Sequence, residues 1–178
     1  MVDAPRFITE ALRDEHDRAA FSSGSAALDR YFRQQAGQGH RWGITAVYVA
    51  LDTTGENTII GFYTLSATAV ATATLPSDLT RKLPRYPALP AVLIGRLARD
   101  ERWRGQRVGF RLMVDAFDRV IAASTQIGAL FTVVEAKDDA ARRFYERCGF
   151  QLFPNSDNTL YLSLATIREM QKRFPNRA

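Results

Sequence analysis

Residues 102–112 read RWRGQRVGFRL. Two glycines four positions apart, Gly105 and Gly109, stand among arginines, after a short apolar run and before a segment of helical spacing. The first turn of a helix leaves several backbone N–H groups without partners and carries a positive partial charge. Glycine lets an anion approach those groups without interference from a Cβ atom, and the three arginines before the helix add full charges. The stretch therefore predicts a turn that binds an anion such as pyrophosphate.

The composition is that of an ordinary folded domain. The chain has 178 residues, of which 46% are hydrophobic and 24% charged, so we expect one domain spanning residues 1–178. A single cysteine, Cys148, excludes an internal disulfide and favours a reducing compartment. No run of about 18 apolar residues is present, and the N-terminal residues include acids where a signal peptide has an apolar stretch. The sequence thus predicts a cytoplasmic protein without a membrane span.

Positive charge is concentrated in one segment. Residues 76–111 hold nine lysines and arginines against three acids, while the whole chain carries a net charge of only +5. Such a local field favours a polyanionic ligand, either a nucleotide or a nucleic acid. A solvated basic face explains the charge alone equally well.

The first half of the chain predicts two helices and a hairpin. We expect a helical region over residues 8–21 and a second helix over 26–36, with Ser25 as N-cap and Gly37 as its end. Residues 45–51 and 58–71 are rich in β-branched and aromatic residues and are separated by the turn sequence GEN, which indicates an antiparallel pair of strands.

The second half predicts a strand–helix–strand unit within a mostly antiparallel sheet. Four of the seven prolines lie in residues 75–90, which indicates an irregular connection. The elements expected after it are a strand over 91–98, a helix over about 106–123, a strand over 129–136, a helix over 138–148 and two strands over 150–153 and 159–164. The order indicates an α/β or α+β three-layer domain with a mixed, mostly antiparallel central sheet flanked by helices.

Two motifs in the correct order make the prediction specific. Residues 104-RGQRVG-109 match the pattern [Gln/Arg]-x-x-Gly-x-[Gly/Ala], although Arg107 stands where glycine is usual. Residues 138-DDAARRFYERCGF-150 match Asn-x-x-Ala-x-x-x-Tyr-x-x-x-Gly-Phe, with Asp138 in place of asparagine. This pair resembles the GNAT superfamily of acetyl-CoA-dependent N-acetyltransferases. The resemblance implies the GNAT fold, with acetyl-CoA as co-substrate and a cofactor-binding core over about residues 91–150.

The resemblance extends to one branch of that superfamily. Segments such as GFYTLSA (61–67) and RYPALPAVLIGRLARD (85–100) are similar to the toxin acetyltransferases of bacterial toxin–antitoxin pairs. That branch acetylates the α-amine of aminoacyl-tRNA and thereby stops translation. The resemblance covers about residues 7–164 and implies three partners, namely an aminoacyl-tRNA substrate, a ribbon-helix-helix antitoxin and a second copy of the chain.

The resemblance also implies the site residues. Tyr145 would be the general acid that protonates the sulfur of CoA, whereas its place in an apolar helical stripe with Ala141, Phe144 and Cys148 is equally typical of a core tyrosine. No metal is implied. The cofactor-binding residues would be Leu97, Ala98, Arg99, Arg104, Gly105, Gln106, Arg107, Val108, Gly109, Asp138 and Ala141, the first three through their backbone groups.

The expected chemistry needs no strong base. An α-amine beside an ester has a pKa below the value of about 7.7–8.0 for a free α-amine, so much of it is neutral at pH 7. This agrees with the position of both histidines, His16 and His40, outside the two motifs. Glu135, at the end of a predicted strand, is a candidate for orienting a water or the amine, and a structural role is equally open. Cys148 is expected to be a buried apolar residue rather than a nucleophile.

The proline-rich connection is the candidate tRNA contact. Arg81, Lys82 and Arg85, joined by Arg6 and Arg41 if the fold brings them close, would bind tRNA phosphates, although a solvated loop would carry the same residues. Two other functions remain open from the sequence: an acetyltransferase for a small amine or a protein N-terminus, and a non-catalytic sensor of acyl-CoA with the GNAT fold.

Overall fold

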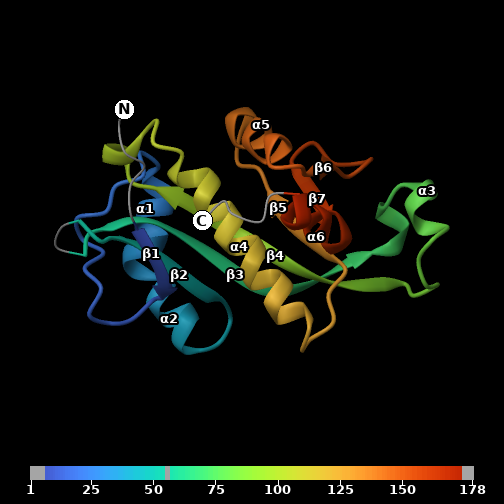
Figure 1. Ribbon diagram of the computed structural model, residues 1–178, viewed down its shortest axis with the longest axis horizontal. Helices are drawn as coiled ribbons and strands as arrows, with labels where there is room; N and C mark the ends of the chain where they lie inside the picture. Colours follow the sequence, from blue (N-terminus) through green and yellow to red (C-terminus); the bar gives the residue numbers. More distant parts are fainter. Residues whose placement is uncertain (1–6, 55–56, 174–178) are drawn as a thin grey trace. The chain divides into compact units, whose positions relative to one another are not determined.

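A computed structural model describes residues 7–54 and 57–173. Seven strands form one sheet in the order β1-β2-β3-β4-β5-β7-β6 (Figure 1). The strands are β1 Phe7–Ala11, β2 Ala46–Asp52, β3 Ile59–Ala71, β4 Ala88–Arg99, β5 Phe131–Glu135, β6 Gln151–Leu152 and β7 Thr159–Ser163. The helices are α1 Ala26–Gln34, α2 Ala36–Arg41, α3 Ser77–Thr80, α4 Val108–Ser124, α5 Asp139–Arg147 and α6 Leu164–Arg173. β4 and β5 are parallel, whereas β1–β2, β2–β3, β5–β7 and β6–β7 are antiparallel, so the mixed, mostly antiparallel sheet of the prediction is confirmed.

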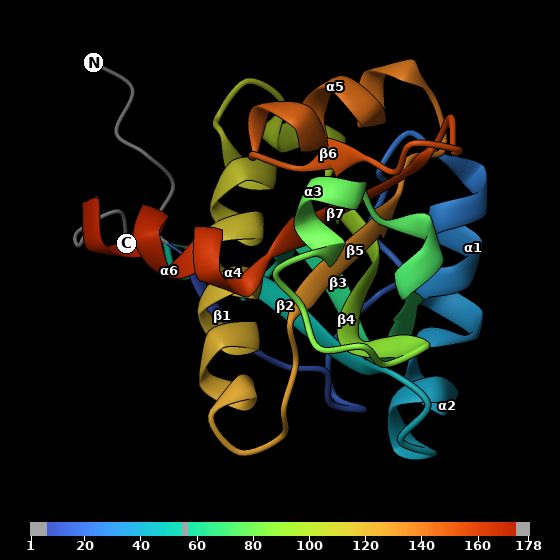
Figure 2. The same ribbon diagram turned by 90° about the vertical axis from the view of Figure 1, so that its right-hand side faces the viewer.

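The chain divides into two compact units. The described residues of Met1–Ser66 and Arg96–Ala116 form the first unit, and those of Ala67–Gly95 and Phe117–Ala178 form the second. β3, β4 and α4 each contribute to both units. In the second unit, the segment carrying α3 connects the ends of β3 and β4 and projects from them (Figures 1 and 2).

Aromatic packing dominates the core of the first unit. The rings of Phe32 on α1 and Phe62 on β3 are stacked with centroids 4.1 Å apart, and Phe21 contacts both rings edge-on. All three side chains are buried. The predicted apolar stripe of α4 is also buried, and Gly61 of β3 lies so close to it that a Cβ atom would be 2.7 Å from Leu112 Cδ1. Glycine is therefore required there to let the strand and the helix meet.

The second unit has its own apolar core. Val70, Leu89, Ala91, Phe131 and Val133 are buried together with Phe153 and Tyr161. Leu89 and Ala91 lie two residues apart on β4, as do Phe131 and Val133 on β5, which is expected of one face of a sheet. Gly149 ends α5 with a φ of +102°, and Asp138 caps its start, as predicted.

The predicted helix over residues 8–21 is wrong. Residues Phe7–Ala11 form an edge strand paired with β2, and residues 12–25 form turns and extended segments. Phe7 and Thr9 decide this, because they lie two residues apart and both contact α4. The Phe7 ring lies 4.1 Å below the guanidinium of Arg111, and the Thr9 hydroxyl donates to Asp115 at 2.8 Å. Tertiary contacts with a period of two outweigh the helix propensity of the segment.

The other differences are local. The helix expected to end at Gly37 ends at Gln34, and Gly37 lies inside α2. Helix α6 was not predicted, although the Ser163 hydroxyl accepts the N–H of Thr166 and so provides a capping signal. Residues 55 and 56 of the predicted hairpin turn, and Arg6, lie outside the described residues.

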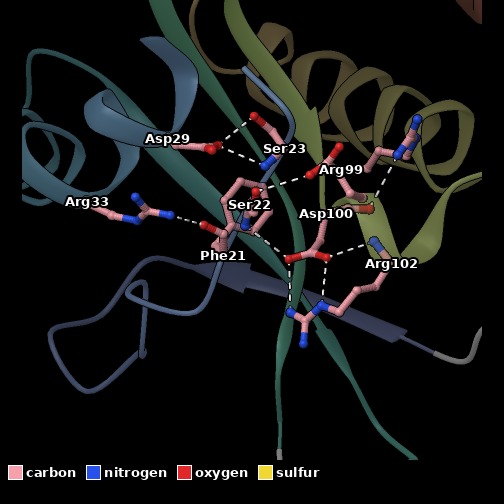
Figure 3. A network of polar contacts seen from close by, with 9 residues as sticks. Phe21, Ser22, Ser23, Asp29, Arg33, Arg99, Asp100 and Arg102 are labelled. Atoms are coloured by element: carbon pink, nitrogen blue, oxygen red, sulfur yellow. Dashed lines mark hydrogen bonds and ion pairs between the residues drawn. The ribbon is translucent and has the colours of Figure 1, made fainter. Parts of the chain in front are cut away.

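One buried carboxylate joins the N-terminal loop to the turn that precedes α4 (Figure 3). Asp100 is fully buried. Its oxygens accept hydrogen bonds from Nε and Nη2 of Arg102 at 2.8 and 2.9 Å, and from the backbone N–H groups of Ser22 and Arg102 at 3.1 and 3.0 Å. The N–H of Glu101 donates in turn to the carbonyl of Ser22 at 2.8 Å. These bonds fix the end of β4 and hence the start of the turn.

The network keeps Asp100 ionised. Burial raises the pKa of Asp100. The hydrogen bonds from Arg102 and Ser22 and the positive charge of Arg102 lower it by a larger amount in total, so the pKa lies below its ordinary value of 3.8. A carboxylate with a depressed folded-state pKa stabilises the fold at pH values above its unfolded pKa. That stabilisation is lost as the pH falls through the folded pKa.

Replacing this carboxylate should therefore give a pH-dependent loss of stability. Asp100→Asn removes the charge while keeping the shape, and we expect it to lower the free energy of unfolding at pH 7 by about 2–3 kcal/mol. Urea unfolding at a series of pH values measures this. The difference in the free energy of unfolding between variant and wild type should decrease below pH 3.8. The control Asp157→Asn, at an exposed position, should show no such difference. A gap of equal size at all pH values would contradict the ionised network.

Candidate active site

The backbone of the turn before α4 adopts positive φ angles at two positions. Residues 104–107 form the turn and α4 begins at Val108. Gly105 and Arg107 both have positive φ, at +80° and +57°. The N–H of Arg111 donates to the carbonyl of Arg107 at 3.1 Å, which is the first bond of the helix. In this pattern the N–H groups of Val108, Gly109 and Phe110 come before the first intrahelical bond and point out of the helix end.

Arg107 explains how the turn forms without the usual glycine. Its φ of +57° lies in the left-handed region, which costs a residue with a Cβ atom roughly 1–2 kcal/mol. The chain thus adopts the glycine-type conformation at this position and carries a guanidinium there as well. Apart from the two chain neighbours of Gly105, no atom of the described residues lies within 4 Å of the place where a Cβ atom would stand. An anion can therefore approach the turn closely.

The arginines around the turn differ in their roles. Arg102 is committed to the buried Asp100. Arg104 and Arg107 are exposed, and within the described residues neither has an ion-pair partner. Two uncompensated guanidinium groups therefore adjoin the N-terminus of a 17-residue helix. Positive charge beside a helix N-terminus is typical of a site for a phosphate-type anion.

The end of β4 presents its backbone alternately to β3 and away from it. The N–H of Asp100 donates to the carbonyl of Ile60 at 2.8 Å, and the N–H of Arg96 donates to the hydroxyl of Thr64 at 3.0 Å. Successive residues of a strand point their backbone groups in opposite directions. Ala98 therefore faces β3 like its neighbours at 96 and 100, whereas Leu97 and Arg99 direct their N–H and C=O groups away from β3.

The parallel ladder between β4 and β5 is short. It pairs Ala91, Val92 and Leu93 with Phe131, Thr132 and Val133. β5 nevertheless continues to Glu135, where it is paired on its other side with Thr159 of β7. In this register the last two residues of β5, Val134 and Glu135, pair with β7 and not with β4. A ligand with amide groups can therefore form hydrogen bonds with the edge of β5 that β7 does not occupy.

Helix α5 places a buried phenol. Asp138 caps the helix by accepting the N–H of Ala141 at 2.7 Å, a bond that the carbonyl oxygen of an asparagine would accept equally well. The Tyr145 ring packs edge-on against Phe150 and is 7% exposed. Burial, with smaller effects from Cys148 and Asp138, raises the pKa of Tyr145 to about 12. The phenol is therefore fully protonated at neutral pH, and within the described residues its hydroxyl makes no hydrogen bond.

Cys148 is a buried residue of the second unit. Its side chain is buried, and burial raises the pKa of the thiol to about 11, so no useful fraction of thiolate exists at neutral pH. The expectation of a small apolar core residue is confirmed. No group of three metal-binding side chains occurs in the described part of the chain, and none of its helices is long and apolar enough to cross a membrane.

The basic connection between β3 and β4 is exposed. Arg81, Lys82 and Arg85 all lie on it in the second unit, and Tyr86 beside them is 63% exposed. The bond from Thr72 N–H to the carbonyl of Pro87, at 3.0 Å, closes the base of this arm. In the first unit, Arg41 pairs with Asp14 at 2.9 Å, which compensates its charge.

Sequence reasoning missed two features, one in each unit. It overlooked Asp100. This acid directly follows a mostly apolar strand, and a carboxylate buried at such a place needs a charged or hydrogen-bonding partner. It also missed a cavity of about 360 Å³ in the second unit. The loop between β6 and β7 and the end of β3 line that cavity, and no local pattern marks either segment as part of a site.

The comparisons with known proteins agree with this geometry. Residues 43–152 match the family described as "Acetyltransferase (GNAT) domain". The chain is 34% identical to a tRNA-acetylating toxin of Mycobacterium tuberculosis over 94% of this chain and 95% of that protein. It is 31% identical to the probable toxin TacT of Sinorhizobium fredii, over 94% and 96% of the two chains.

Solved structures of similar proteins contain an acetylated aminoacyl-tRNA or acetyl-CoA. AtaT complexed with acetyl-methionyl-tRNAfMet has a TM-score of 0.85 and 31% identity, covering 93% of this chain and 99% of that one. A tyrosine-to-phenylalanine mutant of AtaT, bound to the C-terminus of the antitoxin AtaR and acetyl-CoA, has a TM-score of 0.77 and 27% identity over 92% and 97% of the chains. The match to the family model over residues 43–152 and the 34% identity to a tRNA-acetylating toxin show that this chain is a member of the GNAT acetyltransferase family.

Proposed function

We propose that this protein transfers the acetyl group of acetyl-CoA to the α-amine of aminoacyl-tRNA and so acts as the toxin of a toxin–antitoxin pair. The single observation that carries the proposal is the similarity, over 94% of the chain, to a tRNA-acetylating toxin. The complex of AtaT with acetyl-methionyl-tRNAfMet supports the same substrate class. Because that substrate is used in translation, the proposal includes the cytoplasm as the compartment.

The turn and β4 would hold the co-substrate. The N–H groups of Val108 and Gly109 and the guanidinium groups of Arg104 and Arg107 would bind the pyrophosphate, with Gly105 and Gln106 shaping the loop. Along β4, Leu97 and Arg99 would pair with the amides of the pantetheine arm, with Ala98 between them. Asp138 would orient α5 through its cap on Ala141. The exposed helix end and the open space at Gly105 fit these roles.

Tyr145 would act as the general acid. Acetyl-CoA supplies the acetyl group as a thioester, and its sulfur leaves as a thiolate when the bond from amine nitrogen to carbonyl carbon forms. The Tyr145 hydroxyl would donate its proton to that sulfur. A phenol with a pKa of about 12 carries its proton at neutral pH, so the donor is available there. The attacking amine would lose its own proton to water, and water would return a proton to the Tyr145 oxygen.

The basic arm would bind the tRNA backbone. Arg81, Lys82 and Arg85 are exposed and lie on one connection of the second unit. Phosphate contacts there would give an affinity that falls with salt. Partners in the cell would be a ribbon-helix-helix antitoxin, in line with the AtaR complex of AtaT, and a second copy of this chain.

The role of the phenol is tested by removing one oxygen atom. Tyr145→Phe should lower acetylation of aminoacyl-tRNA by about 10²–10⁴-fold, the usual contribution of a positioned acid. Its dissociation constant for CoA, measured by calorimetry, should stay within about twofold. Tyr161→Phe is the control. It removes the hydroxyl of another buried tyrosine of the second unit, which donates a hydrogen bond to Gln151 Oε1 at 3.2 Å, and this variant should keep normal turnover. Near-normal turnover of the Tyr145 variant would remove this residue from the mechanism.

Two substitutions at position 107 separate backbone strain from charge. Arg107→Gly and Arg107→Ala both remove the guanidinium and should weaken CoA binding by a similar factor of about 3–10. Only glycine relieves the left-handed conformation, so the glycine variant should be more stable than the alanine variant by about 1 kcal/mol in urea unfolding. Equal stabilities would show that the turn stores no strain. Unchanged CoA affinity in both variants would exclude Arg107 from the phosphate site.

Charge reversal tests the basic arm. The double variant Arg81→Glu, Arg85→Glu should lower kcat/KM for aminoacyl-tRNA by at least about 100-fold and reduce the slope of affinity against salt concentration. The rate of acetyl-CoA hydrolysis, measured as the release of free thiol, should equal that of the wild type. The same tRNA activity in variant and wild type would place the tRNA contact elsewhere.

A further inference from the structure

The cavity of the second unit opens where the parallel ladder ends. It has a volume of about 360 Å³, at the lower end of the range of about 300–1,000 Å³ that is typical of small-molecule pockets. Leu93 and Val133, the last pair of the β4–β5 ladder, both line it, and so does Glu135 two residues further along β5. Only two residues lie between Glu135 and Asp138, which caps the helix that carries Tyr145.

The lining of the cavity has a distinct chemistry. Four apolar side chains of its lining belong to the core of the second unit and are called its floor below: Val70, Leu93, Val133 and Phe153. Neutral polar side chains also line it, namely Thr68, Thr74, Asn155, Ser156 and Thr159. Glu135 is the one ionisable side chain among the lining residues, and none of them is cationic. A ligand that enters this cavity therefore meets one negative charge over an apolar surface.

The charge of Glu135 is not compensated from within the described chain. Its side chain is exposed, and within residues 7–54 and 57–173 it has no ion pair and no hydrogen bond. The nearest cation along the chain, Lys137, pairs instead with Asp138 at 3.8 Å. Without a partner, the carboxylate repels any second negative charge brought into the cavity.

We infer that this cavity receives the amino-acid side chain of the aminoacyl-tRNA, and that Glu135 makes it selective by excluding acidic side chains. The inference rests on the proposed function and names the substrate class within it. An uncharged side chain can cover the apolar floor. An aspartyl or glutamyl side chain would have to lose water against that floor and lie beside an unpaired carboxylate.

Three nearly isosteric amino acids on one tRNA test this inference. A single tRNA sequence, charged with leucine, asparagine or aspartate, keeps the tRNA body constant. Asparagine and aspartate differ in charge alone, so the ratio of their kcat/KM values measures electrostatic selection. Wild type should favour leucyl-tRNA, and should prefer asparaginyl- to aspartyl-tRNA by at least about 30-fold.

Variants at position 135 should change that ratio in a defined direction. Glu135→Gln should reduce the preference for asparagine over aspartate by about tenfold, and Glu135→Lys should invert it, while leucyl-tRNA is affected by less than about threefold in the glutamine variant. Asp157→Asn is the matched control, since Asp157 lies in the loop between β6 and β7 but does not line the cavity. It should leave every ratio unchanged. Unaltered affinity for CoA verifies that each variant is folded.

The possible failures are distinguishable. Equal rates for the three amino acids in wild type, or an unchanged ratio in both Glu135 variants, would overturn the inference and leave tRNA acetylation intact. They would also indicate that another part of the substrate fills the cavity. Failure to acetylate all three charged tRNAs, with CoA still bound, would overturn the proposed function itself.

Discussion

The buried Asp100 carboxylate is the constraint on which the first unit depends. It binds a guanidinium and two backbone N–H groups, and through them it ties the N-terminal loop at Ser22 to the end of β4. A buried charge is tolerated only when its lone pairs are satisfied, and here they are. The position of the turn over residues 104–107, and with it the exposed end of α4, follows from this fixed point.

The charged and titratable side chains of the two units differ in their surroundings. Arg102 is neutralised inside the network, whereas Arg104 and Arg107 remain exposed at the helix end, where an anion gains most from them. Burial raises the pKa of Tyr145 to about 12, and Glu135 lines a cavity without an ion-pair partner among the described residues. The first unit thus presents positive charge at a helix end, and the second unit holds a neutral phenol and a negative charge, each set by local packing and hydrogen bonding.

Local signals explain what the sequence could predict. α4 and α5 were located within about two residues because their apolar period, the Asp138 cap and Gly149 are all short-range features. The edge strand at Phe7 could not be found in this way, because its state depends on pairing with residues 48–52 and on contacts with Arg111 and Asp115. The cavity at Glu135 was missed for the same reason, since its lining comes from four separate segments.

The central claim is that the start of α4 binds the pyrophosphate of acetyl-CoA. A crystal structure of the protein grown with CoA tests it most directly. The account predicts pyrophosphate oxygens about 2.7–3.2 Å from the backbone nitrogens of Val108 and Gly109, with Arg107 still in its left-handed conformation. A pyrophosphate bound elsewhere, with the Arg107 side chain lying across the helix end, would contradict it.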